Sequence, residues 1–152
     1  MTDSKHGGME TKLEQTERAL PIALLRAREK VMGPVREMLA NAPVNEQKWR
    51  VLRVLDESGA QDQNSIARAA CLLLPSLTRI LRAMECDGLI SRCPDPEDRR
   101  RSIVTIEQGG RDILERYKDQ ARKITADLRE SFGADKLDNL LDLLEDLQRT
   151  KV

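Results

Sequence analysis

Arginines in two short segments are the residues of this sequence best suited to bind a charged ligand. The first segment, 75–86, predicts an amphipathic helix whose apolar face repeats at helical spacing and consists of Leu77, Ile80, Leu81 and Met84. The opposite, polar side then carries Pro75, Ser76, Thr78, Arg79 and Arg82. An arginine can donate two hydrogen bonds to guanine O6 and N7, and hydroxyl groups can bond bases or phosphates. This pattern favours duplex DNA as the ligand, and the alternative is a surface helix with solvated arginines.

The second arginine cluster lies in a charged loop between two strand-like runs. The runs 89–92 and 102–106 flank the turn-rich residues 93–98 and predict a β-hairpin. Its tip carries Asp98, Arg99, Arg100 and Arg101. A narrow DNA minor groove attracts inserted arginine, and we expect Asp98 to orient the Arg100 guanidinium through a charge-assisted hydrogen bond. The alternative is a solvated charged turn.

Residues that could support catalysis or metal binding are sparse. The three cysteines, Cys71, Cys86 and Cys93, form no Cys-x-x-Cys pair, and the single histidine, His6, lies in a polar N-terminal tail. There is no glycine-rich phosphate loop, nucleophile elbow or histidine-based triad. We therefore predict no enzyme, catalytic residue, metal or cofactor. Cys71 lies among alanine and leucine, so we expect it to be buried. A regulator that senses oxidants through a cysteine is kept as an alternative.

The elements that position these clusters follow from apolar spacing and turn residues. Residues 1–16 are polar and predict a flexible tail, and 17–44 predict a helix with a kink or break at Gly33-Pro34. Asn45 can cap a helix that Gly59 ends, and a short helix over 64–70 opens at Asp62 or Gln63. Two further helices are predicted at about 111–131 and 134–149. The predicted fold is mainly α, with a winged helix-turn-helix over 45–106 and helical segments at 17–44 and 107–152.

Composition limits how such a protein could bind DNA. The 152 residues hold 26 Lys+Arg and 26 Asp+Glu, which argues against a purely electrostatic binder, and only three aromatic residues, which argues against a base-stacking platform. Residues 68–101 nevertheless carry seven arginines against five acids, whereas 107–152 carry nine Lys+Arg against eleven acids. Specificity must therefore come from a few placed arginines. The longest apolar run is too short to span a bilayer and no signal peptide is visible, so we expect a cytoplasmic protein.

Apolar stripes outside the central module predict a second surface. The module does not need them, and they lie near the two ends of the chain, at Leu20, Leu24, Leu137, Leu140, Leu144 and Leu147. We interpret them as a homodimer interface, because two-fold symmetric proteins read pseudo-palindromic operators with half-sites about one helical turn apart. An intramolecular core is the alternative.

Three motifs, in this order and spacing, identify a family resemblance. They are Leu77-Thr78-Arg79-Ile80-Leu81, the run from Met84 to Arg92, and the run from Asp95 to Arg101. Across about 18–150 the sequence resembles the MarR family of bacterial transcriptional regulators. The resemblance implies a mostly helical dimer, an Asp-x-Arg wing motif at Asp98 and Arg100 whose arginine enters the minor groove, and a recognition helix in the major groove. The family's Leu-Thr-x-x-Gly is replaced by 106–110, so the helix that follows the wing is expected to start elsewhere or to be capped by Thr105.

The resemblance also implies a small-molecule effector. The segments 47–55 and 70–79 are similar to regulators of homoprotocatechuate (aromatic acid) degradation operons, which are repressors released from DNA by an aromatic acid. A small phenolic or aromatic carboxylate needs apolar walls and a cation. The candidates on the first two helices are Arg26, Arg28, Met32, Arg36, Trp49, Arg50 and Arg53. A helical adaptor that binds protein through its winged module is the competing function.

Overall fold

The computed structural model describes residues 15–152, and the chain forms two compact units, 1–33 and 34–152. His6 and nearly all of the predicted tail at 1–16 lie outside the described residues. The first unit contains a short 3₁₀ helix, Thr16–Arg18, and most of α1, Leu20–Met38. α1 continues through Gly33 and Pro34, so of the predicted kink or break the break is wrong, and the kink stays a prediction. Both residues are exposed, so water can solvate the carbonyl whose partner N–H is missing at Pro34.

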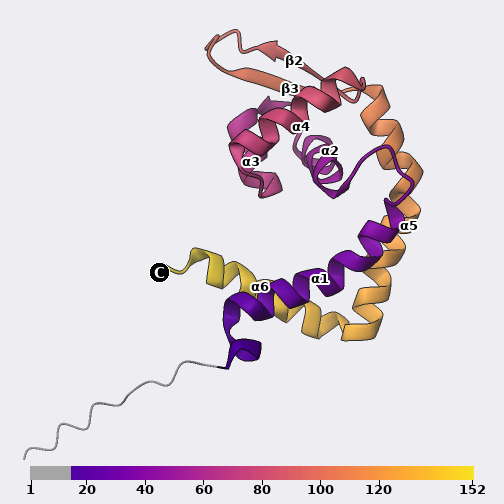
Figure 1. The fold of residues 1–152 in the computed structure, drawn as a ribbon, viewed down its shortest axis with the longest axis vertical. Coiled ribbons are helices and arrows are strands. Elements are labelled where there is room, and N and C mark those ends of the chain that lie inside the picture. The colour runs from indigo at the N-terminus through magenta and orange to yellow at the C-terminus, as the bar shows by residue number, and fades with distance from the viewer. Residues whose placement is uncertain (1–14) are drawn as a thin grey trace, which may run out of the picture. The chain divides into compact units, whose positions relative to one another are not determined.

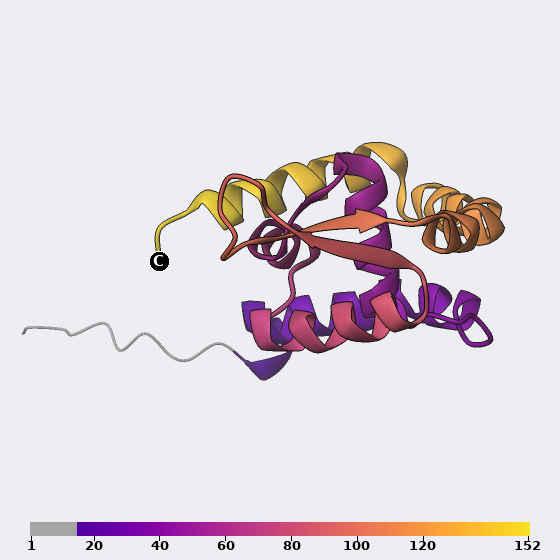
Figure 2. The ribbon, with the colours of Figure 1, turned by 90° about the horizontal axis from the view of Figure 1, so that it is seen from above.

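The second unit contains a helix-turn-helix, a hairpin and two long helices (Figure 1). The predicted order of elements is confirmed. The elements are α2 Glu46–Ser58, β1 Gln61–Asp62, α3 Gln63–Ala70, α4 Leu74–Cys86, β2 Ile90–Pro94, β3 Ser102–Ile106, α5 Gln108–Phe132 and α6 Ala134–Arg149. Viewed from above, α4 lies along one side of the hairpin, and α5 leaves from the end of β3 (Figure 2).

Local signals in the sequence fix where α2 and α3 begin and end. The Asn45 carboxamide accepts a hydrogen bond from Lys48 N at 2.9 Å, and Gly59 ends α2 at φ 77°. The Asp62 carboxylate accepts one from Ser65 N at 2.8 Å and caps α3. Cys71 ends α3 in the left-handed region, at φ 52°. The Asn45 and Asp62 side chains satisfy N–H groups that the first turn of a helix leaves without partners.

The antiparallel sheet has the strand order β1-β3-β2. Within the hairpin Ile90 pairs with Ile106 and Pro94 with Ser102, and β1 pairs Asp62 with Ile103. Sequence analysis did not predict β1, because a two-residue strand has no periodicity and forms only through its distant partner. An aliphatic core is buried between the sheet and the helices α2, α3, α4 and the start of α5. The completely buried side chains are Val51, Leu52, Leu55, Ile66, Leu77, Leu81, Met84 and Val104.

α5 begins at Gln108, three residues before the predicted start, and Glu107 is its N-cap. Thr105 lies in β3, so its predicted capping role is wrong. Gly109 and Gly110 lie in the first turn of α5, where neighbouring chain segments leave no room for a side chain. A Cβ on Gly110 would lie 2.6 Å from Leu89 O and 2.8 Å from Leu52 Cδ2. Gly110 therefore allows α5 to pack directly against the winged module.

α5 leads away from the module to α6, and Gly133, at φ 108°, separates the two helices (Figure 1). α1 and α6, both described in full, contain no buried residue. Across residues 15–152, no helix combines the length and the apolar character needed to cross a membrane.

Candidate nucleic-acid interface

The outer face of α4 presents arginines that are free to bind a ligand. Arg79 and Arg82 are exposed, and within the described residues their side chains make no hydrogen bond or ion pair. Pro75 is also exposed, while Ser76 and Thr78 are half-buried. Leu77, Leu81 and Met84 are completely buried on the opposite face, so the helix cannot rotate without exposing them. The core thus fixes the direction in which both arginines point.

Thr78 has a structural role that its sequence position did not reveal. Its hydroxyl donates to Leu74 O at 3.0 Å and accepts from Gln63 Nε2 at 2.5 Å. These bonds join the first residue of α3 to the first turns of α4. Thr78 therefore sets the geometry between the two helices of the turn motif, and its hydroxyl proton is already committed.

The wing loop, residues 95–101, is organised by its own carboxylates. Asp95 Oδ1 accepts from Glu97 N at 2.9 Å, and Asp98 Oδ1 accepts from Arg100 N at 3.0 Å. The predicted bond from Asp98 to the Arg100 guanidinium is wrong, because the carboxylate bonds the backbone amide in a tight turn. Arg99 and Arg100 are exposed, and neither side chain has a partner in the described part of the chain.

Arg101, the third arginine of the wing, is exposed but ion-paired with the helix-turn-helix. Its guanidinium pairs with Asp62 Oδ2, while Asp62 Oδ1 caps α3. The Ser65 backbone amide and the Arg101 guanidinium together hold the pKa of Asp62 at about 2, below its usual 3.8. One carboxylate thus joins the wing to the helix-turn-helix. The helix-opening role of Asp62 was predicted, but its pairing with Arg101 spans 39 residues and left no local signal.

Replacing Asp62 should therefore reduce stability in a pH-dependent way. Because its pKa is lower in the folded state, its contribution is complete above the unfolded value near 4 and is lost as pH falls toward about 2. Asp62→Ala also loses the cap and should destabilise by about 0.5–2 kcal/mol at pH 7. Asp62→Asn retains a capping side chain and should lose less.

Urea unfolding between pH 7 and pH 2.5 measures this effect. The stability difference between wild type and Asp62→Asn should shrink steadily below pH 4. A difference that is constant over this range would contradict the role of the charged carboxylate.

A second ion pair ties the hairpin to α4. Arg92, on β2, donates to Glu85 at 3.1 and 3.3 Å, and this lowers the pKa of the Glu85 carboxyl. The two anchors tie the wing to the helices at two points: Arg92–Glu85 joins β2 to α4, and Arg101–Asp62 joins the end of the wing loop to α3. Arg99 and Arg100 therefore project from a fixed base.

The three cysteines all lie in the second unit. Cys71, Cys86 and Cys93 are all exposed and none is in a disulfide. The predicted burial of Cys71 is wrong, because this residue terminates α3 and occupies the turn before α4.

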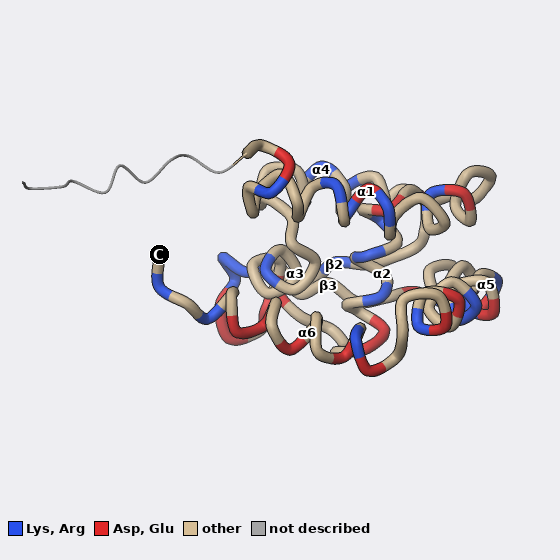
Figure 3. Tube along the Cα trace, turned by 90° about the horizontal axis from the view of Figure 1, so that it is seen from below, with Lys and Arg blue, Asp and Glu red and all other residues tan. Residues whose placement is uncertain are grey.

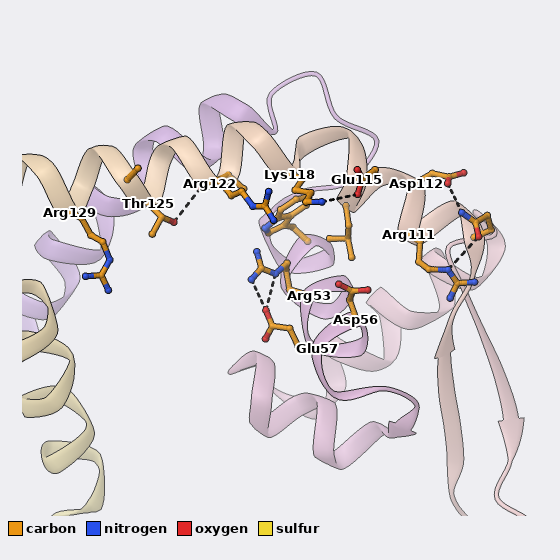
Figure 4. A pocket seen from close by; sticks show the side chains of 15 residues that line it. Arg53, Asp56, Glu57, Arg111, Asp112, Glu115, Lys118, Arg122, Thr125 and Arg129 are labelled. Atoms are coloured by element: carbon orange, nitrogen blue, oxygen red, sulfur yellow. Dashed lines mark hydrogen bonds and ion pairs between the residues drawn. The ribbon is translucent and has the colours of Figure 1, made fainter. Parts of the chain in front are cut away.

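A groove of about 810 Å³ runs between α2 and α5 (Figure 4). Trp49, Leu114 and Ala121 supply apolar surface, and Trp49 packs edge-on against Tyr117, with ring centroids 6.3 Å apart. The groove also contains five cationic side chains, Arg53, Arg111, Lys118, Arg122 and Arg129. Four of them are engaged: Arg53 with Glu57, Arg111 with Ile106 O, Lys118 with Glu115, and Arg129 with Asp138. Arg122 alone among these five has no partner in the described residues.

The predicted ligand residues are only partly brought together. Of these candidates, Trp49 and Arg53 line the groove. Arg50 points elsewhere and donates to Ala70 O at 2.7 Å, where it holds the C-terminus of α3. Arg36 lies 3.9 Å from Glu46. Arg26, Arg28 and Met32 belong to the first unit, whereas the groove lies in the second. Arg122 was missed, because a lone arginine on a polar helix carries no sequence signal.

The predicted interface leucines are largely uncovered. Leu20 and Leu24 on α1, and Leu140 and Leu147 on α6, are exposed, whereas Leu137 and Leu144 are half-buried. α6 is otherwise predominantly acidic, whereas α4 carries mainly basic residues (Figure 3). Within the second unit, the basic α4 and the leucines of α6 thus lie on different helices, of opposite charge.

Comparisons with known proteins agree with this geometry. The MarR family model matches residues 44–102. The homoprotocatechuate degradative operon repressor of Escherichia coli is 37% identical over 128 residues, covering 84% of this chain and 86% of that protein. The crystal structure of NadR in complex with 4-hydroxyphenylacetate has a TM-score of 0.79 at 32% identity and covers 91% of this chain and 99% of its own. The repressor CouR bound to a 23-mer DNA duplex has a TM-score of 0.77 at 30% identity, with the same coverage.

The matched family segment contains α3, α4, the hairpin loop and their anchors, and the relatives match most of the chain in both sequence and fold. These relatives are named as regulators and repressors, which is not an enzymatic class. The chain therefore belongs to the MarR family of transcriptional regulators.

Proposed function

We propose that this protein is a dimeric repressor that binds a pseudo-palindromic operator and is released from it by a small aromatic carboxylate. It would act in the cytoplasm, where bacterial operators lie. The observation that carries DNA binding is the set of four exposed arginines without partners in the described chain, two on α4 and two on the wing. In this arrangement Arg79 and Arg82 face the major groove, and Arg99 and Arg100 face the adjacent minor groove. Ser76 and Pro75 border the same surface, and Asp98 shapes the loop.

A dimer is supported by the uncovered leucines of α1 and α6. Exposed apolar stripes of this length are costly on a lone chain, and a second copy would cover them. Two wings and two recognition helices would then be related by two-fold symmetry, as a pseudo-palindromic site requires.

The effector site is proposed in the groove between α2 and α5. Its volume of about 810 Å³ lies within the usual range for small-ligand sites, and it combines an aromatic wall with cations. Arg53 and Arg122 both point into this groove (Figure 4). Because Arg122 needs no broken ion pair to bind a carboxylate, we assign it the carboxylate and assign Trp49 the ring. The ligand would favour a spacing of the two DNA-binding modules that no longer matches the operator.

The test uses 4-hydroxyphenylacetate, the ligand present in the NadR structure, as the probe. Titration should change Trp49 fluorescence and release a duplex that the protein has selected from a random pool. Arg122→Gln should weaken both responses about tenfold or more, as expected for loss of a charge-assisted bond. Arg116→Gln removes an exposed arginine of the same helix that does not line the groove, and should leave both responses intact.

Retention of full ligand response in Arg122→Gln would reject the groove assignment. If no aromatic acid affects DNA affinity, the effector part of the proposal fails and the DNA-binding part stands.

A further inference from the structure

Two leucines at the start of α4 expose apolar surface that the described chain leaves uncovered. The Leu73 residue is 77% exposed and Leu74 is 43% exposed, and Pro75 beside them is also exposed. Apart from the terminal Val152, Leu73 is the most exposed large apolar residue in the described part of the chain. Exposed apolar surface concentrated at one helix end favours a binding role for that end.

The fold does not explain a leucine at position 73. This residue is the N-cap of α4, and α4 has no side-chain capping bond. Asn45 and Asp62 cap α2 and α3 through their side chains, as this position normally requires. The Leu73 side chain thus makes no capping hydrogen bond and buries little apolar surface within the described chain. A residue that breaks a local rule without compensation within the fold points to function.

The position of Leu73 at the start of α4 indicates which chemical group it would contact. In a helix-turn-helix, the N-terminal residues of the second helix reach the base edges of the major groove, and helical side chains tilt toward that end. Arg79 and Arg82 on the same helix provide the positive charge that holds this surface against DNA. The C5 methyl of thymine is the apolar group that base pairs present in the major groove.

We propose that Leu73, flanked by Leu74, contacts a thymine methyl in each half-site and makes the protein select thymine at that position. This inference rests on the proposed function as an operator-binding dimer. It assigns part of the specificity to an apolar contact, which is consistent with the absence of a strongly basic net charge.

The test removes single methyl groups from DNA. A duplex is first selected from a random pool by the wild-type protein, and each thymine is then replaced by uracil, which differs only in lacking the methyl. At one position in each half-site, uracil should weaken binding by roughly fourfold, the value of one buried methyl-sized group. With Leu73→Ala, the thymine and uracil duplexes should bind equally at that position.

Leu73→Asn separates this role from a structural one. Asparagine is a better N-cap than leucine, so this variant should melt at a higher temperature than wild type. It should nevertheless lose the discrimination between thymine and uracil. A purely structural leucine would not lose discrimination while gaining stability.

Each outcome decides the proposal. Equal binding of all thymine and uracil duplexes by wild type overturns it, as does discrimination that persists in Leu73→Ala. If Leu73→Ala keeps discrimination but changes the oligomeric state, Leu73 contacts another chain instead. If wild type recovers no duplex from the pool, the proposed function itself fails and this inference fails with it.

Discussion

Replacing Leu140 and Leu147 together by aspartate is expected to produce a monomer and to weaken operator binding by about a hundredfold or more. Both leucines are exposed on α6, so the change should leave the buried core of the winged module intact. In a dimer, binding of the second half-site is intramolecular, and separating the subunits removes this advantage without altering a single DNA contact. The charges would also prevent the apolar stripes from packing, because an unpaired buried carboxylate is costly.

Sedimentation and DNA titration at matched protein concentrations measure this prediction. Asn139→Asp is the control, since it adds one carboxylate to an exposed polar position next to Leu140. The control should remain dimeric and bind normally. A double variant that becomes monomeric yet keeps wild-type affinity would contradict the two-half-site arrangement.

Arg100→Ala is expected to give the second large effect, a loss of roughly 1–3 kcal/mol of DNA-binding free energy per half-site. Its side chain has no partner in the described residues, and its backbone is fixed by Asp98 at the wing tip. Any phosphate contact that it makes should also contribute about 0.9 to the slope of log affinity against log salt. Thermal stability should be unchanged, because the exposed side chain supports no other part of the fold.

Arg101→Ala provides the contrast. Arg101 is bound to Asp62, so its removal should lower the melting temperature and loosen the wing, whereas Arg100→Ala should lower affinity alone. Unchanged affinity in Arg100→Ala, together with no dependence of duplex binding on salt, would favour the protein-binding adaptor over a DNA-binding regulator.

Much of the fold could be predicted from local physical chemistry. Asn45, Gly59 and Asp62 mark helix ends through capping bonds and backbone conformation, and these depend on residues three or four positions away. The apolar periodicity of 77–84 identified the buried face of α4, and β-branched residues identified β3. β1 and the start of α5 were harder to predict from the sequence, because both depend on contacts with residues far along the chain. Examples are Val104 for β1 and Leu89 for Gly110 in α5.

The candidate site divides in the same way. Exposure of Arg79, Arg82, Arg99 and Arg100 follows from helical periodicity and turn composition. The ion pair of Arg101 with Asp62 and the hydrogen bond of Arg50 to Ala70 O could not be predicted from the sequence. A guanidinium can reach several partners, and only the packed chain selects one. The contacts of the four exposed arginines with DNA, and those of Trp49 and Arg122 with an effector, stay predictions.

The sequence by itself determined the family, the order of elements and the polar face of α4, because all three are written in motifs and in spacing along the chain. Only the tertiary structure decided which arginines are free and which hold the wing in place, and it alone placed Trp49, Arg53 and Arg122 in one groove. It also showed that the leucine before α4 is left exposed instead of joining the core. The physical reason is that periodicity fixes the direction of a side chain relative to its own helix, whereas its partner depends on residues brought together by the fold.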